Sequence, residues 1–252
     1  AAVGTPDEHF DTVVSRLVAS GEVKSWKARE ILLAIGVDKT TDAGVMGTAA
    51  GKVILFGEHA AVYGRHALAL PLPDAVSASI AATDEGLSLS IPAWGISRRV
   101  DRGKSGGIDA AIVLILDSLG VEDTGMAISV NTSLPQAMGL GSSAAIAVAV
   151  TRAVVRFLGI TSDDERVNSI AYACEKLAHG TPSGIDNTVS TYAQPMLFCN
   201  DGGLQFETLQ LAEVPPIVIA SGHEAGLTSE QVAAVRSRYE RLSTRYEALF
   251  DE

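Results

Sequence analysis

The sequence predicts an α+β fold in which several short strands and a few long helices share one core. Its 252 residues are 47% hydrophobic and 19% charged, which is typical of a well-packed globular chain of this length. Short apolar runs between glycine turns predict strands, and longer stretches with apolar residues at helical spacing predict helices. The two kinds of element do not alternate regularly, which favours an α+β domain over repeated βαβ units.

The first part of the chain is predicted to be helical and separate from the main domain. Apolar residues recur at helical spacing between residues 10 and 32, and the turn-forming stretch 36–44 then indicates a linker. We therefore expect three regions: a helical extension and linker over 1–44, an α+β domain over 45–213, and the incomplete beginning of a second α+β domain over 214–252.

After residue 44 the pattern changes to short strands and longer helices. Apolar runs bounded by turn residues predict strands at 52–57, 67–70, 75–82, 87–91, 127–131, 196–199 and 217–220. Helical periodicity predicts helices at 107–119, 142–158 and 162–177. From Val232 to Leu249, apolar or aromatic residues are spaced by three and four, which predicts one amphipathic helix that packs on the preceding domain or on a partner.

The composition argues against several functional classes. The formal net charge of −11 disfavours a nucleic-acid-binding surface, because basic groups supply most of that affinity. No apolar run approaches the roughly 20 residues that span a bilayer, and the polar, acidic first residues do not resemble a secretory signal. Two cysteines and five scattered histidines form neither a disulfide framework nor a zinc cluster. We expect a cytoplasmic protein that binds neither nucleic acid nor membrane.

The most informative segment is a glycine turn, Gly139-Leu140-Gly141-Ser142-Ser143-Ala144, which leads into a helix rich in small residues. Glycine lets the main chain approach a ligand closely, and the first N–H groups of a helix have no partner within the helix. The aligned peptide dipoles also favour negative charge at this end. The glycine turn therefore predicts an anion-binding site whose natural ligand is a phosphate.

The glycine turn also has other interpretations. It matches the dinucleotide-binding fingerprint, but the acidic residues that follow, Asp163 and Asp164, lie at a predicted helix start and not at the end of a strand. A Walker loop does not fit, because Gly103-Lys104-Ser105 lacks a glycine five places earlier. A turn that binds no ligand and simply precedes a packed helix remains the structural alternative.

Two further segments carry clusters of functional side chains. In the first, Lys52 stands at the start of a predicted strand, and Glu58 and His59 follow at its end. In the second, a helix carrying Glu175 runs into a Gly-Thr-Pro-Ser-Gly loop that presents Asp186. Loops with this much turn chemistry often position functional groups. Taken alone, each segment is equally consistent with a solvated turn or a capped helix end.

Together these segments resemble the GHMP kinases, a family of small-molecule kinases. The stretch 135–144 resembles the phosphate loop of the family, and 52–64 with 179–187 resembles the mevalonate kinases within it. The resemblance covers about residues 47–240 and departs at Ala50, where the first family motif usually has proline. It implies that the main domain has the fold of a GHMP kinase N-terminal, ATP-binding domain, which is ribosomal protein S5 domain 2-like.

The two ends of the chain depart from the family pattern. Nothing after Val232 resembles the third glycine-rich loop of the family, so we expect only the first strand and helix of the C-terminal domain. Residues 4–32 resemble, more weakly, the C-terminal helices of bacterial-type HMG-CoA reductases, which make mevalonate. The alternative is a helical extension unrelated to either enzyme.

The resemblance assigns a task to each conspicuous residue. ATP and Mg²⁺ are the implied cofactors, because kinases of this kind neutralise phosphate charge with a metal ion. The resemblance implies that the phosphates of ATP bind at Gly139, Leu140, Gly141, Ser142, Ser143 and Ala144, that Ser143 and Glu175 hold Mg²⁺, that Asp186 and Lys52 are catalytic, and that Glu58, His59 and Thr228 bind the acceptor.

The implied activity is ATP-dependent phosphorylation of mevalonate at its C5 hydroxyl, a step of isoprenoid biosynthesis. Phosphomevalonate and other acceptors of GHMP kinases are the enzymatic alternatives, and a non-catalytic nucleotide-binding fragment is the alternative outside enzymes. The stretch 103–107 is a candidate adenine loop. Because members of the family are often dimers, the apolar stripe over 232–249 is either an interface of a homodimer or part of a core.

Overall fold

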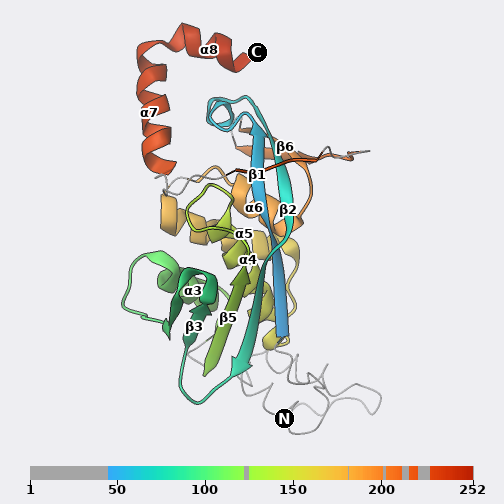
Figure 1. Ribbon diagram of the computed structural model, residues 1–252, viewed down its shortest axis with the longest axis vertical. Helices are drawn as coiled ribbons and strands as arrows, with labels where there is room; N and C mark the ends of the chain where they lie inside the picture. The colour runs from blue at the N-terminus through green and yellow to red at the C-terminus, as the bar shows by residue number, and fades with distance from the viewer. Residues whose placement is uncertain are drawn as a thin grey trace.

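The computed structural model describes residues 45–121, 125–180, 182–200, 203–211, 216–220 and 228–251 (Figure 1). The helices and linker predicted within 1–44 lie outside these residues. The strands are β1 (Val45–Phe56), β2 (His66–Ala82), β3 (Ser88–Ile91), β4 (Ile96–Arg99), β5 (Met126–Thr132), β6 (Met196–Asn200) and β7 (Leu204–Thr208). The helices are α3 (Gly107–Ser118), α4 (Ser142–Phe157), α5 (Asp164–His179), α6 (Ile185–Tyr192), α7 (Thr228–Arg241) and α8 (Ser243–Asp251), with 3-10 helices η1 (Ala60–Tyr63) and η2 (Pro92–Trp94). None of the helices in this part of the chain is long and apolar enough to cross a bilayer.

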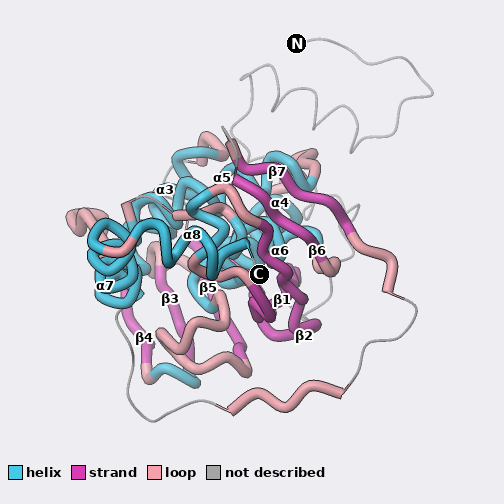
Figure 2. The backbone as a smooth tube through the Cα atoms, turned by 90° about the horizontal axis from the view of Figure 1, so that it is seen from above, coloured by secondary structure: helices cyan, strands magenta, loops and turns pink. Residues whose placement is uncertain are grey.

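The strands form one seven-stranded sheet, which confirms the predicted α+β class. The strand order is β4-β3-β5-β2-β6-β7, and β1 pairs with β2 beside this path. β3 and β5 are parallel, whereas β2 is antiparallel to β1, β5 and β6. Figure 1 shows β1 and β2 side by side through much of the molecule, and Figure 2 shows α3, α4 and α5 on one side of β3 and β5. The β1–β2 pair thus links the two parts of the sheet.

β2 is continuous where the sequence predicted two strands. Pro71 and Pro73 lie between the two predicted strands, and proline cannot donate to a ladder. In the structure the pairing with β6 ends at Ala69 and the pairing with β5 begins at Val76, so the prolines interrupt no ladder on that side. β1 pairs along the other side with a register shift near Gly51, and for this reason β1 begins well before the predicted residue 52.

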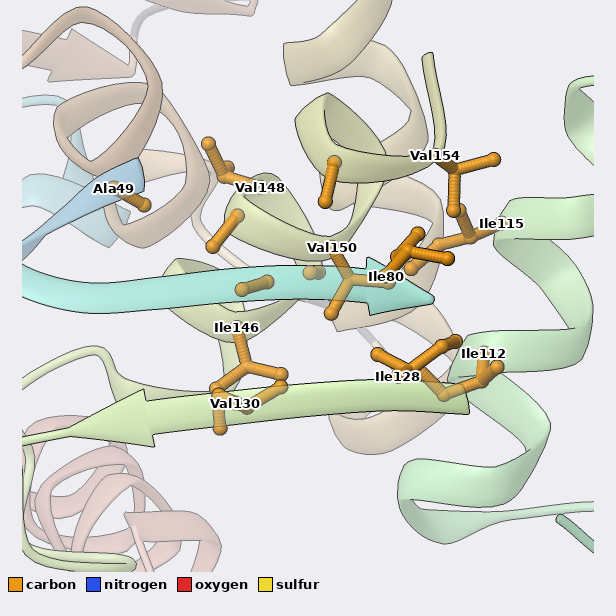
Figure 3. Close-up of a cluster of buried hydrophobic side chains, with 14 of the residues drawn as sticks. Ala49, Ile80, Ile112, Ile115, Ile128, Val130, Ile146, Val148, Val150 and Val154 are labelled. Atoms are coloured by element: carbon orange, nitrogen blue, oxygen red, sulfur yellow. The ribbon is translucent and has the colours of Figure 1, made fainter. Parts of the chain in front are cut away.

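α4 is the central helix of the core. Most of its 16 residues are buried, as expected for a helix that is apolar on almost every side. Burying a Val or Ile side chain contributes about 1.5–3 kcal/mol, so this cluster is a large part of the stability of the fold. Figure 3 shows the contributing side chains Val148, Val150 and Val154 of α4, Ile80 of β2, Ile128 and Val130 of β5, and Ile112 and Ile115 of α3. The glycine turn therefore precedes a helix that is held firmly in place.

Gly47 lets β1 approach α4 closely, and enlarging it should destabilise the fold. A Cβ at Gly47 would lie 2.2 Å from the Ala149 oxygen and 2.5 Å from the Ala153 nitrogen, both main-chain atoms of α4. We expect Gly47→Ala to lower the free energy of unfolding by about 1–3 kcal/mol, measured by urea denaturation, because strand and helix must separate. Gly103→Ala is the matched control, since the nearest atom is the tip of the Asp101 side chain at 3.3 Å. Equal stability of the two variants would contradict the prediction.

Several short elements were not predicted, and one predicted strand is wrong. β4 and β7 are mostly exposed, so their sequences lack the alternation that marks a half-buried strand. α6 occupies part of the segment predicted as a loop, because its eight residues are too few for a helical period to stand out. The strand predicted at 217–220 has no regular structure, and Val218 is 93% exposed. In the described part of the chain no strand pairs with it.

The C-terminal amphipathic segment forms two helices, not the one that was predicted. α7 ends at Arg241 and α8 begins at Ser243, and the chain turns between the two helices (Figure 1). The Tyr63 ring stacks on Tyr239 and Phe250 with centroid distances of 4.1 and 5.2 Å. Arg65 pairs with Glu247 and Asp251 of α8. Tyr239 and Phe250 therefore contact the preceding domain, whereas Leu242 and Leu249 of the apolar stripe are 44% and 54% exposed.

Candidate active site

The glycine turn has the backbone geometry that its sequence predicted. Gly139 and Gly141 have φ values of 73° and 70°, a left-handed conformation that costs other residues about 1–2 kcal/mol. Gly141 is the N-cap of α4 and provides no side-chain capping bond. The first N–H groups of α4 are therefore left for a ligand, and the helix dipole adds partial positive charge there.

A main-chain hydrogen bond joins β1 to the glycine turn. The Lys52 N–H donates to the Leu140 oxygen at 3.0 Å. A Cβ on Gly141 would lie only 2.8 Å from Lys52 Cγ, so only glycine fits at this position without displacing the lysine. Lys52 lies in the second half of the 12-residue β1, not at the start of a strand as predicted. Its side chain therefore emerges directly beside the turn.

Lys52 and Asp186 form an ion pair at the start of α6. The Lys52 Nζ and Asp186 Oδ1 atoms are 3.1 Å apart, with the lysine side chain 6% and the aspartate side chain 30% exposed. Gly184, with φ of 84°, is the N-cap of α6 and puts Asp186 in the first helical turn. The acid is thus carried by a helix that packs on β1 and α4, which orients it more rigidly than the predicted loop would.

Ser143 and Glu175 form a second polar contact near the same turn. The Ser143 hydroxyl of α4 donates to Glu175 Oε1 of α5 at 2.5 Å, and Glu175 is only 3% exposed. Burial raises the pKa of the Glu175 carboxyl and the charge of Asp186 raises it further, while the Ser143 hydrogen bond, His179 and Lys52 act in the opposite direction. A buried carboxylate with a raised pKa gains stability from a nearby cation.

The oxygens of this pair fit a hard divalent cation such as Mg²⁺. Carboxylate and hydroxyl oxygens are suitable ligands, and Mg²⁺ keeps several waters and binds substrate phosphates alongside one or two protein groups. Within the described ranges there is no group of three or more His, Cys, Asp or Glu that could hold a metal by itself. The site thus suits a metal shared with a phosphate ligand better than an all-protein metal cage.

The remaining predicted site residues lie at different places. Glu58 is exposed and His59 is half-buried as the N-cap of η1, on the turn that follows β1. None of the described contacts brings either side chain to Lys52 or Asp186. Ser142 and Ala144 are buried in α4, so they offer a ligand mainly their main-chain groups. Thr228 begins α7, but its side chain lies outside the described part of the structure.

Sequence reasoning missed a polar contact behind the site. The side-chain amides of Asn168 in α5 and Asn187 in α6 meet at 2.6 Å, and Asn187 is 2% exposed. Asn187 follows Asp186 directly and so could have been suspected, whereas Asn168 lies within an ordinary amphipathic helix and gives no signal. Only the packing of α5 against α6 joins them.

The candidate adenine loop is held by a buried acid at the start of α3. Asp109 is 1% exposed and accepts hydrogen bonds from Arg98 Nη1 at 2.6 and 2.7 Å, with Lys104 Nζ 3.4 Å away. Burial raises the pKa of Asp109, but the hydrogen bonds and charges of Arg98 and Lys104 outweigh it, and the net pKa lies below the ordinary value. The basic groups of this loop are therefore neutralised within the protein.

The depressed pKa of Asp109 predicts a pH-dependent contribution to stability. A lowered pKa in the folded state means that the stabilisation is present above the ordinary value of 3.8 and is lost as the pH falls through the folded-state pKa. We expect Asp109→Asn to lower the free energy of unfolding by about 1–2 kcal/mol at pH 7, with the deficit shrinking below pH 3.8. Urea denaturation at several pH values measures this. Asp117→Asn, an exposed acid of the same helix, should show no such deficit.

Comparisons with known proteins identify the fold. Residues 106–194 match the family described as GHMP kinases N terminal domain. The mevalonate kinase of Pyrococcus furiosus is 35% identical over 215 residues, which cover 79% of this chain and 63% of that protein. The crystal structure of Methanococcus jannaschii mevalonate kinase has a TM-score of 0.59 and 27% identity, covering 67% of this chain and 56% of that chain. The L. major mevalonate kinase in complex with R-mevalonate has a TM-score of 0.61 and 25% identity, covering 84% and 65%.

This chain spans less than two thirds of the length of each of these relatives. The matched family region, 106–194, includes the glycine turn, Glu175 and Asp186. The similarity in sequence and structure to mevalonate kinases agrees with that match. Residues 106–194 therefore match the N-terminal domain of the GHMP kinases, and the relatives that the chain resembles are mevalonate kinases.

Proposed function

We propose that the protein transfers the γ-phosphate of ATP to the C5 hydroxyl of mevalonate. The observation that carries the proposal is the Lys52–Asp186 ion pair, which stands beside the uncapped start of α4. The relatives named mevalonate kinase, one of them crystallised with R-mevalonate, support the choice of acceptor. The glycine turn and the Ser143–Glu175 contact support ATP as the donor.

In the proposed reaction Asp186 is the general base. The oxygen of the acceptor hydroxyl attacks the γ-phosphorus, the bond from that phosphorus to the bridging oxygen of ADP breaks, and the hydroxyl proton passes to Asp186. Lys52, with its Nζ 3.1 Å from Asp186 Oδ1, holds the carboxylate in position through the ion pair. Its ammonium group also stabilises negative charge that develops on the transferred oxygens.

The main chain of the glycine turn is the proposed cradle for the phosphates of ATP. Phosphoryl transfer needs positioning and charge neutralisation more than covalent chemistry, because the charge is spread over the transferred oxygens. The N–H groups and the partial positive charge of the helix start supply both without a mobile side chain. The residues of the cradle are Gly139, Leu140, Gly141, Ser142, Ser143 and Ala144.

Ser143 and Glu175 are the proposed protein ligands of Mg²⁺. The metal, when bound, would neutralise charge on the phosphates of ATP. The burial of Glu175 supports this role, because a carboxylate that is costly to ionise in the free protein gains most from a neighbouring cation. The hydroxyl of Ser143 lies 2.5 Å from Glu175 Oε1, so the two proposed ligand oxygens are already neighbours.

The acceptor side of the site and the domain organisation are further parts of the proposal. Glu58, His59 and Thr228 are proposed to contact the acceptor. The proposed domains are a helical extension and linker over 1–44, an ATP-binding domain over 45–213 and the beginning of a second domain over 214–252. The packing of α7 and α8 on η1 supports a contact between the second domain and the turn that carries Glu58 and His59.

A comparison of acceptors tests the proposed function. ADP release is measured with Mg-ATP and mevalonate, phosphomevalonate, galactose or homoserine, and the control omits Mg²⁺. We expect turnover with mevalonate only, and dependence on the metal. A preference for another acceptor would overturn mevalonate as the substrate but keep the assignment as a small-molecule kinase. ATP binding without transfer to any acceptor would leave a nucleotide-binding protein and overturn the kinase proposal.

A further inference from the structure

The amides of Asn168 and Asn187 lie behind the site and touch neither Lys52 nor the glycine turn. Asn168 is on α5, about two helical turns before Glu175 and hence on the same face of that helix. Asn187 is on α6, next to Asp186, and its amide lies 2.6 Å from that of Asn168. The amide pair therefore joins the helix that carries the proposed metal ligand to the helix that carries the proposed base.

α6 needs such a tether because it is short. Its eight residues form about two turns, and a helix of this length has little stability by itself. Its last turn is held by Arg152 of α4, whose guanidinium donates to the Thr191 oxygen at 2.8 Å. Its first turn carries Asp186 and has the lysine ion pair on one side and the amide pair on another. Ile185 and Val189 of α6 are buried in the core, and the amide pair adds a directional contact to α5.

The amide pair fixes the orientation of α6 in a way that apolar packing would not. Burying an amide is costly unless it is hydrogen-bonded, and the bond is directional. The amide orientation that satisfies the neighbours places the Asn187 oxygen, not its nitrogen, 2.6 Å from the Asn168 amide. The Asn187 nitrogen then donates to the Gly184 oxygen at 3.1 Å. The amide pair thus ties α5 to the left-handed N-cap residue of α6 as well as to its first turn.

We infer that Asn168 and Asn187 are positioning residues that hold the Asp186 carboxylate at its working place relative to Glu175 and the glycine turn. The inference rests on the proposed function, in which Asp186 is the base. Neither amide contacts the reacting atoms. Loss of the pair should therefore lower the rate of transfer and leave ATP binding, which depends on α4, nearly unchanged.

A double-mutant cycle with two readouts tests the inference. The variants are Asn168→Ala, Asn187→Ala and both together, and the measurements are kcat, the KM for ATP and hydrogen–deuterium exchange of residues 184–190. We expect each single variant to lower kcat about 10- to 100-fold, the range for groups that orient a catalytic ligand, with the KM for ATP changed less than about threefold. The double variant should match the singles, because the pair acts as one unit. Exchange should quicken in α6 alone.

Thr191→Val is the matched control. The Thr191 hydroxyl donates to the main-chain oxygen of Asn187 at 2.7 Å, so Thr191→Val also removes a buried hydrogen bond from α6 but leaves the side-chain amide pair in place. We expect a similar loss of stability and an unchanged kcat. Equal losses of kcat in Thr191→Val and Asn168→Ala, or multiplied losses in the double variant, would overturn the inference. If Asn187→Ala does not fold, Asn168→Ser replaces it, since Asn168 is only half-buried.

The two readouts separate this inference from the proposed function. If the wild-type protein is active and the variants keep its kcat and its hydrogen–deuterium exchange, the inference is overturned and the kinase proposal stands. Absence of turnover with every acceptor would overturn the kinase proposal. The exchange of α6 would then still decide whether the amide pair holds this helix, and unchanged exchange would overturn the tether as well.

Discussion

Asp186→Asn is expected to lower kcat by about 10²- to 10⁴-fold while ATP binding stays nearly unchanged, because general-base catalysis contributes this much to proton-transfer steps. The substitution keeps the shape of the side chain and removes the proton acceptor. It also leaves Lys52, now 3.1 Å from an uncharged amide, without its partner in an almost fully buried position. The loss should therefore appear in kcat and not in the KM for ATP.

The measurement for Asp186→Asn is steady-state ADP release together with ATP binding by calorimetry. Asp163→Asn is the matched control, because it makes the same change at the exposed N-cap of α5, where Asn caps as well as Asp. The control should keep wild-type turnover. Wild-type turnover in Asp186→Asn itself would remove this residue from the role of base.

Gly141→Ala is expected to have the largest effect on ATP binding. Alanine at φ of 70° costs about 1–2 kcal/mol of strain. In addition, its Cβ would lie 2.8 Å from Lys52 Cγ. The strand and the turn cannot easily move apart, because the Lys52 N–H donates to the Leu140 oxygen. Such overpacking adds about 1–3 kcal/mol, so we expect a total loss of about 2–5 kcal/mol in the free energy of unfolding. Distortion of the phosphate cradle should weaken ATP binding more than tenfold.

Gly139→Ala isolates the steric part of this prediction. Gly139 has φ of 73°, almost the same as Gly141, but a Cβ there meets nothing within 4 Å. We therefore expect only the strain of about 1–2 kcal/mol in Gly139→Ala. Urea denaturation gives the stabilities and calorimetry the affinities for ATP. If the two variants behave alike, the contact between Gly141 and Lys52 does not shape the site.

Much of the site could be predicted from local sequence. The glycine turn and the start of α4 were placed correctly, because positive φ values and an uncapped helix start leave a local pattern of glycine and small residues. α3 and α5 were also predicted within about two residues, since each is long enough to show its period. The resemblance to GHMP kinases rested on such local motifs, and the family match confirms it.

Other elements depended on distant neighbours and could not be predicted. The continuity of β2 through Pro71 and Pro73 depends on where β5 and β6 end. The strand predicted at 217–220 has the right residues for a strand but no partner in the described residues. The two C-terminal helices turn where their aromatic residues meet Tyr63, which lies far away in the sequence.

The sequence by itself determined the fold class and the glycine turn at the start of α4, and through the family resemblance it predicted functional roles for Lys52, Ser143, Glu175 and Asp186. The fold class and the turn follow from local conformational preferences, which a short stretch of chain already contains. Only the tertiary structure decided that Lys52 lies 3.1 Å from Asp186, that Ser143 bonds Glu175, and that an amide pair ties α5 to α6. The physical reason is that these contacts join residues of different elements, and only the packing of the helices against β1 and against one another brings them together.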